Sequence, residues 1–302
     1  MNQILFFSVI IPTYNRDNID VAIQSVLSQT FCDYEIIVVD DHSDVPAIER
    51  CACLRNEKIH YFYLEQNGGA AVARNYGIEK SQGEYIAFLD DDDEWYANKL
   101  DVLYECLRNN RPDLVYHNVI VNMVYEKLTY ATHKKQEESY WPLLLYRSPI
   151  GGTPSVAIKR DLLNKIGCFD EALRADEDGE LFTRIAKYSK NIICIEQVLG
   201  VFNVRTKVSS LTKTLEPRED ARRKIEEKYK KDIECLTSEQ QCIMREVYLS
   251  AFSYAMMLNY NKKAAFKYSW KAFLVRGNFR YLGQALLCFI SIKLLFFLRT
   301  KM

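Results

Sequence analysis

The chain is organised around residues 83–95, Gly83-Glu84-Tyr85-Ile86-Ala87-Phe88-Leu89-Asp90-Asp91-Asp92-Asp93-Glu94-Trp95. Ile86 to Leu89 form a short apolar run, which is typical of a strand buried on both faces of a parallel sheet. Four aspartates follow at once, and open α/β sheets bind their ligands at the carboxyl ends of strands. The sequence therefore predicts a functional site at this end of a sheet.

The four aspartates repel one another unless a cation or solvent neutralises them. A divalent cation that also bridges a diphosphate accounts for the run, and oxygen ligands favour Mg²⁺ or Mn²⁺. A solvated acidic turn is the alternative. A calcium EF-hand loop is disfavoured, because Trp95 stands where that motif places its sharp-turn glycine.

The first 95 residues alternate between strand and helix patterns. Strands are predicted at 6–11, 35–39, 59–64 and 86–89, and helices at 19–27, 46–56 and 70–80. This repeat is the signature of a parallel sheet with right-handed crossovers. The predicted class is α/β, a Rossmann-like and mostly parallel sheet flanked by helices.

The remainder of the chain is mixed at first and then helical. Helices are predicted at 98–109, 140–146, 160–166 and 179–188, strands at 113–122, 123–132, 155–158, 192–195 and 200–204, and a loop at 149–154. Ser, Thr and Lys dominate 205–215, which we interpret as a boundary. Only helices are predicted beyond it, at 218–231, 238–259, 262–275 and 280–298. We therefore expect a catalytic domain at 1–210 and a basic helical region at 211–302.

Charge and cysteine content limit the possible functions. Forty basic and forty acidic residues give a net charge of zero, so nothing attracts the whole chain to nucleic acid. The nine cysteines lack metal-binding spacing, and Cys51 and Cys53 are predicted to pack on a helix rather than bind a metal. With Met1 to Gln3 leading directly into a strand pattern, we expect a cytoplasmic protein.

Carboxylates are the main candidates for chemistry. The chain has no G-x-x-x-x-G-K-[ST] and no G-x-G-x-x-G loop, and its four histidines are dispersed. Three acidic clusters remain: Asp40-Asp41, Asp90 to Asp93, and Asp176-Glu177-Asp178.

Five segments occur in the order and spacing of family-2 glycosyltransferases, which the chain resembles over its first 200 residues. They are 8–16 (SVIIPTYNR), 35–41 (EIIVVDD), 67–75 (NGGAAVARN), 83–93 (GEYIAFLDDDD), and 167–171 with 177–181 (GCFDE and EDGEL). The resemblance implies the GT-A nucleotide-sugar fold and transfer of one sugar with inversion at the anomeric carbon.

The resemblance also implies roles on the nucleotide side. Pro12, Thr13 and Asn15 would line the nucleotide pocket. Asp40 or Asp41 would accept a hydrogen bond from uracil, with a strand-end turn acid as the alternative for either. Arg74 matches the basic residue near the nucleotide in this family, or it is an ordinary arginine on a helix surface.

The aspartate run fits the family's DXD pattern. Asp90 would reach the ribose or the metal shell, Asp92 would hold the metal, and Asp93 could assist it. In the family's pattern a small residue is common at the position of Asp91. Asp91 is therefore grouped with Asp90 on the donor side, and the choice of metal ligand among the neighbouring aspartates stays open.

Asp178 is the candidate general base. Inverting transfer needs a carboxylate that takes the proton of the acceptor hydroxyl while the diphosphate leaves from the opposite face. Glu177, with Gly152 and Thr153 of the loop at 149–154, is placed on the acceptor side. Gly179 replaces a usual aromatic residue, which leaves the acceptor open. The alternative is that these acids only cap a helix N-terminus.

The sequence thus predicts an inverting glycosyltransferase that depends on Mn²⁺ or Mg²⁺ and uses a UDP-sugar. Its expected acceptor is a glycan or lipid-linked glycan in surface polysaccharide synthesis, and no nucleic acid partner is expected. The alternatives are a sugar nucleotidyltransferase, disfavoured by the missing Gly-rich phosphate loop, and a non-catalytic nucleotide-sugar-binding or membrane-associated scaffold.

The C-terminal region has an unusual charge distribution. No acidic residue occurs from Val247 to Met302, whereas nine residues there are Lys or Arg. The apolar stretch at 285–298 is shorter than the ~20 residues of a membrane span. It suits either a helix lying on an anionic membrane surface, peripheral to the inner face of the cell membrane, or a buried helix of a small bundle.

Overall fold

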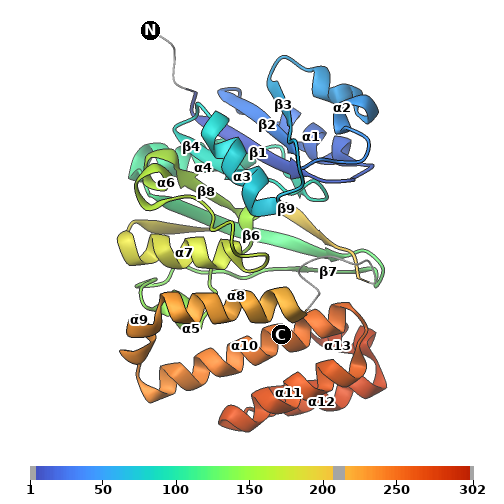
Figure 1. Ribbon diagram of the computed structural model, residues 1–302, viewed down its shortest axis with the longest axis vertical. Coiled ribbons are helices and arrows are strands. Elements are labelled where there is room, and N and C mark those ends of the chain that lie inside the picture. The colour runs from blue at the N-terminus through green and yellow to red at the C-terminus, as the bar shows by residue number, and fades with distance from the viewer. Residues whose placement is uncertain (1–4, 207–214, 300–302) are drawn as a thin grey trace.

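The computed structural model describes residues 5–206 and 215–299, and it contains one large sheet with helices on both faces and a helical region at one end (Figure 1). The strands are β1 (Phe7–Thr13), β2 (Tyr34–Asp40), β3 (Ile59–Tyr63), β4 (Tyr85–Phe88), β5 (Glu94–Trp95), β6 (Leu114–Met123), β7 (Leu128–Ala131), β8 (Val156–Lys159) and β9 (Ile192–Val204). The helices of the sheet region are α1 (Ile19–Leu27), α2 (Ala47–Arg50), η1 (Ala52–Arg55), α3 (Ala70–Lys80), α4 (Lys99–Asn110), α5 (Leu143–Tyr146), η2 (Thr153–Ser155), α6 (Arg160–Ile166) and α7 (Glu177–Tyr188). The C-terminal helices are α8 (Leu215–Lys228), α9 (Lys230–Glu234), α10 (Ser238–Leu258), α11 (Lys262–Arg276), α12 (Phe279–Ile290) and α13 (Ile292–Arg299).

The sheet has the order β3-β2-β1-β4-β8-β6-β9-β5, and β7 pairs with β6 beside β8. Strands β3, β2, β1 and β4 are parallel to their neighbours. Strand β8 is antiparallel to β4 and to β6, whereas β9 is parallel to β6. The predicted α/β class, with helices flanking the sheet and a C-terminal helical region, is confirmed, and the sheet itself is mixed, with four parallel and four antiparallel strand pairings among the described residues.

The first strand, predicted at 6–11, continues through Pro12 to Thr13. Pro12 pairs in register with Val39 of β2, but the pairing with β4 ends at Ile10. Proline has no N–H to donate, so it is tolerated where no neighbouring strand needs that donor.

Other predicted boundaries were wrong as well: the helix predicted at 46–56 is divided at Cys51 into α2 and η1, the strand predicted at 123–132 is the shorter β7, and the helix predicted at 218–231 is divided between α8 and α9. The strands predicted at 192–195 and 200–204 form the single strand β9, whose pairing with β6 is irregular near His117 and Asn118. The helix predicted at 280–298 is two helices, because Ser291 separates α12 from α13 and its hydroxyl accepts a hydrogen bond from the N–H of Leu294. A serine at this position is a common helix N-cap.

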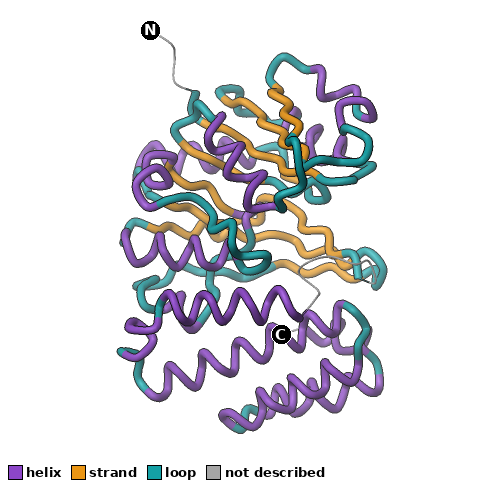
Figure 2. The backbone as a smooth tube through the Cα atoms, viewed as in Figure 1, coloured by secondary structure: helices purple, strands orange, loops and turns teal. Residues whose placement is uncertain are grey.

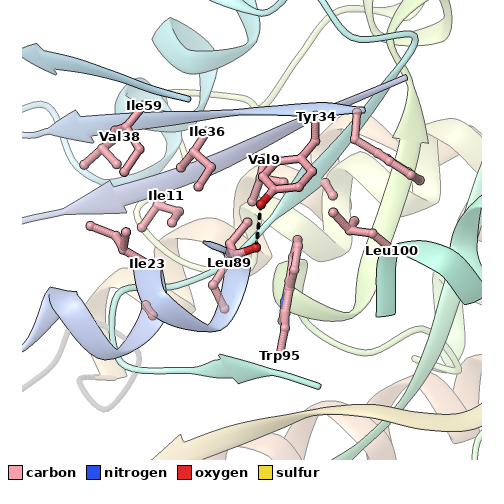
Figure 3. Packing of buried hydrophobic residues seen from close by; sticks show 14 of the residues in the cluster. Val9, Ile11, Ile23, Tyr34, Ile36, Val38, Ile59, Leu89, Trp95 and Leu100 are labelled. Atoms are coloured by element: carbon pink, nitrogen blue, oxygen red, sulfur yellow. Dashed lines mark hydrogen bonds between the residues drawn. The ribbon is translucent and has the colours of Figure 1, made fainter. Parts of the chain in front are cut away.

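Buried side chains cover both faces of the sheet. Alternate residues of β1 point to opposite faces, so Val9 and Ile11 pack on one side with α1 and α4, while Ile10 packs on the other with α3, α6 and α7. Figure 3 shows the first of these faces, where the ring of Trp95 lies beside the strand side chains. The core fixes the strand ends, where the acidic clusters lie.

The C-terminal helices pack against the far part of the sheet. Val119, Val121 and Met123 of β6 share one buried cluster with side chains of α10, α11, α12 and α13. Figure 2 shows the helices of this region, in purple, gathered at one end of the molecule. Within the described residues, no helix combines the length and apolar character needed to cross a membrane. The predicted boundary at 205–215 falls largely on 207–214, outside the described residues, so the division at residue 210 stays a prediction.

Candidate active site

The parallel strands bring two acidic clusters to one edge of the sheet. Thr13, the last residue of β1, pairs with Asp40, the last residue of β2. Leu89 continues from β4 and donates its N–H to the carbonyl of Ile10, and Asp90 follows directly. Thr13, which is predicted to line the nucleotide pocket, therefore lies at the same edge of the sheet as Asp40 and the aspartate run.

Asp91 is held inward by residues of the first strand end. Its carboxylate accepts a hydrogen bond of 2.8 Å from the Thr13 hydroxyl and one of 3.0 Å from Nε of Arg16. Burial raises the pKa of Asp91 to about 6, although Arg16 and Thr13 oppose that rise. Arg16 also forms an ion pair of 3.2 Å with Asp92. The chain itself thus partly neutralises the aspartate run.

Arg16 was missed as a site residue at the sequence level. The available signal was its position, a cation one residue after Asn15 at the end of a strand that neighbours the aspartates.

Asn15 joins two strand-end loops, because its side-chain amide donates to Asp44 at 3.1 Å and its backbone N–H donates to the Ser43 hydroxyl at 2.8 Å.

Asp40 and Asp41 both receive hydrogen bonds from the chain. Asp40 is fully buried and accepts from the N–H groups of Ser43 and Ala47 and from the hydroxyl of Tyr61. This pattern is that of a structural strand-end acid.

Asp41 instead holds the loop before α3. Its carboxylate accepts from the N–H groups of Gly68 and Gly69 at 2.8 and 2.7 Å and from the amide of Asn67 at 2.9 Å. Burial raises the pKa of Asp41, against the effect of the two glycine N–H groups. Contact of either carboxylate with uracil stays a prediction.

Arg74 connects the second acidic cluster with the third. Its guanidinium is buried at 5 % exposure, so it is not an ordinary helix-surface arginine. One nitrogen lies 2.8 Å from Asp90 and another 3.0 Å from Glu177, which is the first residue of α7. A single cation from α3 thereby links acids that come from distant parts of the sequence.

Asp178 lies beside the loop that precedes η2. A Cβ atom at Gly152 would be 3.8 Å from an Oδ atom of Asp178 and 3.7 Å from the ring of Phe202. Burial raises the pKa of Asp178 to about 7, the negative charges of Glu177 and Asp176 add to the rise, and Arg74 opposes it. A carboxyl with such a pKa can exchange a proton near neutral pH.

Asn203 fixes the other end of the aspartate run. Its N–H donates to Asp93 at 2.8 Å, and its side-chain amide donates to the backbone carbonyl of Asp92 at 2.8 Å. Because Phe202 is the preceding residue of β9, the strand joins the Asp92–Asp93 turn to the loop beside Asp178. Phe202 and Asn203 had no signal as site residues, because the sequence showed them only as part of the strand predicted at 200–204.

Lys99 of α4 anchors η2, the short helix that follows Gly152. The side-chain nitrogen of Lys99 donates to the carbonyl of Pro154 at 2.8 Å and lies 3.6 Å from the ring centroid of Trp95. Lys99 is fully buried, and burial lowers its pKa well below the ordinary value. Thr153 is also buried, so Gly152 is the residue of this predicted pair that lies against Asp178.

The aspartate run is also the predicted cation site. Within the described residues, no group of three His, Cys, Asp or Glu side chains is arranged to hold a metal. The carboxylates of Asp90 and Asp92 are part-exposed, and burial together with Asp90 raises the pKa of Asp92. Such a pair fits a Mg²⁺-type ion, which proteins often hold through one or two carboxylates plus substrate phosphates and water.

Comparison with known proteins identifies the family. Residues 8–167, more than half of the chain, match the model described as Glycosyl transferase family 2. The chain belongs to glycosyltransferase family 2. It is 30 % identical over 293 residues to an uncharacterized glycosyltransferase of Haemophilus influenzae, covering 95 % of this chain and 96 % of that protein.

Two relatives with more specific names match shorter segments. A putative teichuronic acid biosynthesis glycosyltransferase of Bacillus subtilis is 46 % identical over 101 residues, 31 % of this chain and 38 % of that protein. An Escherichia coli UDP-Glc:alpha-D-GlcNAc-diphosphoundecaprenol beta-1,3-glucosyltransferase is 37 % identical over 112 residues, 37 % of this chain and 44 % of that protein.

Solved structures share the fold at low sequence identity. The structure of S. aureus TarS 1-349 in complex with UDP-GlcNAc has a TM-score of 0.59 and 18 % identity, covering 96 % of this chain and 90 % of that one. The structure of GalNAc-T7 with UDP, GalNAc and Mn²⁺ has a TM-score of 0.52 and 19 % identity, covering 66 % of this chain and 43 % of that one. The protein is thus a family-2 glycosyltransferase of GT-A architecture.

Proposed function

We propose that the protein transfers one sugar from a UDP-sugar to a hydroxyl of a lipid-linked glycan, with inversion at the anomeric carbon, during surface polysaccharide synthesis. The observation that carries the proposal is the double ion pair of Arg74, whose guanidinium lies 2.8 Å from Asp90 and 3.0 Å from Glu177 at the start of α7. The names of the B. subtilis and E. coli relatives support a polysaccharide product and a lipid-linked acceptor. The UDP-GlcNAc in the TarS structure supports a UDP-sugar donor.

In the proposed reaction Asp178 acts as the general base. The acceptor oxygen bonds to the anomeric carbon as the bond from that carbon to the diphosphate oxygen breaks, and the proton of the hydroxyl passes to Asp178. Its pKa of about 7 suits this exchange at neutral pH. Gly152 leaves room beside the carboxylate, because a Cβ there would lie 3.8 Å from its oxygen.

The basic residues organise the donor side. Arg16 holds Asp91 inward and contacts Asp92, and Arg74 holds Asp90. Mn²⁺ or Mg²⁺ would be held by Asp92 with Asp90 or Asp93, where it would stabilise charge on the leaving diphosphate. Asp93 is the weaker candidate, because Asn203 binds its carboxylate and burial raises its pKa well above the ordinary value.

A donor panel tests the proposal. UDP-sugars and other nucleotide sugars are incubated with an α-GlcNAc-diphosphoundecaprenol acceptor, and released nucleoside diphosphate is measured with Mn²⁺, with Mg²⁺ and with chelator. We expect UDP release that needs acceptor and metal. Release of pyrophosphate from a nucleoside triphosphate and a sugar phosphate would instead indicate a nucleotidyltransferase, and no turnover with any donor would contradict the proposal.

A further inference from the structure

The helices at the C-terminal end carry a large exposed apolar face. We call it the outer face, and its residues are Trp270, Leu274, Phe279, Leu286, Phe289, Ile290, Leu294 and Leu298. Phe279 is 77 % exposed, Ile290 70 % and Leu274 63 %. Ring contacts run from Phe289 through Phe266, Trp270 and Phe273 to Phe279 and so join α11 to α12 across this face. Large exposed apolar surfaces of this kind mark interaction sites.

The outer face is separate from the packing face of the same helices. On α12, Ala285 and Cys288 are fully buried, whereas Leu286, Phe289 and Ile290 are exposed. On α13, Leu295 and Phe296 are buried and Leu294 is exposed. Packing within the bundle, which the sequence left as one alternative, therefore accounts for only one side of these helices.

Exposed basic residues occur on the same three helices as the outer face. Six exposed basic residues of α11, α12 and α13 form no ion pair with any carboxylate of the described chain: Lys262, Lys263, Lys267, Lys271, Arg280 and Lys293. Among the basic residues of these helices whose side chains are described, Arg276 is paired, with Glu239 and Glu246 of α10. No acidic residue occurs after Glu246. The surface therefore combines apolar side chains with unneutralised positive charge.

We propose that the outer face binds the surface of an anionic lipid bilayer. The helices α12 and α13 contain 12 and 8 residues, too short to span a bilayer that needs ~20. Short helices with apolar side chains on one side and lysine or arginine at the rim lie in the plane of the interface. Anionic headgroups supply the negative charge that the chain itself lacks there.

A second copy of the chain fits this surface less well. A symmetric dimer through the outer face would bring the same six unpaired cations of both copies together, and like charges repel. The anionic bilayer satisfies both the apolar and the basic side chains at once.

Attachment through this face is compatible with the proposed acceptor class. Figure 1 shows α11 and α12 at the end of the molecule remote from α2 and β3. The buried cluster of these helices also contacts Phe202, whose ring borders the position of Gly152 beside Asp178. The outer face is thus tied through packed side chains to the acceptor side of the site, although the binding itself needs neither donor nor acceptor.

Vesicle co-sedimentation of the full chain tests the proposal. Vesicles of phosphatidylcholine alone are compared with vesicles that also contain phosphatidylglycerol, at low and high salt. Two double variants are used, Phe279→Ser with Ile290→Ser and Lys267→Glu with Lys271→Glu. The matched control is Tyr188→Ser with Lys190→Glu, which changes an exposed aromatic and an exposed lysine near the end of α7.

We expect the wild type and the control to bind phosphatidylglycerol vesicles and to dissociate at high salt. The apolar double variant and the lysine double variant should each bind about tenfold less, while keeping the circular dichroism spectrum and melting temperature of the wild type. Equal binding by all four proteins would overturn the proposal. So would sedimentation velocity showing a wild-type dimer that the outer-face substitutions dissociate, with no vesicle binding. Vesicle binding is measured without a nucleotide sugar, so its outcome does not depend on whether the protein transfers a sugar.

Discussion

Asp178 is a carboxylate kept in surroundings that disfavour its charge. Burial is the largest cause of its raised pKa, and Glu177 is the next. A base must be ionised to take a proton, so the reaction needs pH values near or above that pKa. The adjacent acid should therefore set the acid side of the pH profile.

Glu177→Gln should shift the acid limb of kcat/KM to lower pH. The free wild-type enzyme should lose kcat/KM as the pH falls through about 7, the pKa of Asp178. Removing the Glu177 charge removes a repulsion and frees Arg74 to favour ionised Asp178, so both effects lower that pKa. The profile is measured beside Glu138→Gln, an exposed-site control. A limb that stays in place or moves upward would rule out this coupling.

Asp178→Asn should stabilise the fold at alkaline pH. The folded-state pKa is above the unfolded one, so the folded state binds more protons between about pH 4 and 7 and loses stability as the pH rises through that range. The neutral amide avoids this loss, and we expect a gain of about 1–2 kcal/mol at pH 8 that shrinks toward pH 5. Thermal melts at both pH values measure it. A lower melting temperature at pH 8 would mean that the charge is not destabilising.

Residue types at the site were predictable where a motif identified them. Thr13, Asn15 and the aspartate run lie at the strand ends that the sequence indicated, and Arg74 reaches Asp90 from α3. Arg16 and Lys99 were not predicted as site residues, because a cation after a strand and a lysine at a helix start are ordinary features on the sequence level. Their importance comes from contacts across the fold, to Asp91 and to the carbonyl of Pro154.

At the scale of elements, α3 presents Arg74 because it lies very close to β1. A Cβ atom at Gly77, one turn from Arg74, would be 2.6 Å from a methyl group of Ile10. Ile10 is fully buried and β-branched, so it has little freedom to move aside. The glycine thus sets the distance between the helix and the sheet.

Gly77→Ala should destabilise the protein by about 1–3 kcal/mol through overpacking. Gly283→Ala in α12 is the control, because a Cβ atom placed there would meet no other atom within 4 Å, and we expect a gain of up to about 1 kcal/mol from helix propensity. Urea unfolding of both variants gives the comparison. A stability for Gly77→Ala equal to that of Gly283→Ala would show that β1 and α3 can separate without cost.

Elements with strong local patterns were predicted to the residue. The helices at 19–27 and 70–80 agree with α1 and α3. The sequence pattern predicted two strands where the structure has the single strand β9. The middle of β9 pairs irregularly with β6, and the side-chain amide of Asn118 donates there to the backbone carbonyl of Glu196. The break before α13 did have a signal, since a serine preceding an apolar run is a common helix start.

At the scale of the whole molecule, the parallel order of β2, β1 and β4 explains why separate acidic segments meet. All three strands end at the same edge, and this much follows from the sequence pattern. The position of α7 does not, because it depends on contacts across the fold: Leu181, Phe182 and Ile185 pack in the core on one face of the sheet, and ion pairs join its N-terminal end to Arg74 and to Arg218 of α8. The C-terminal helices therefore contact the acidic cluster that contains the proposed base.

The central claim is that Asp92 and Asp178 serve one transfer site from its donor and acceptor sides. The most direct measurement is the rate of sugar transfer by Asp178→Asn at saturating donor. The Mn²⁺-dependent binding of UDP is measured in parallel on Asp178→Asn and on Asp92→Asn. We predict that Asp178→Asn loses about 10²–10⁴-fold in kcat and keeps wild-type UDP binding, whereas Asp92→Asn loses the Mn²⁺-dependent part of that binding. Transfer by Asp178→Asn at the wild-type rate would contradict the account.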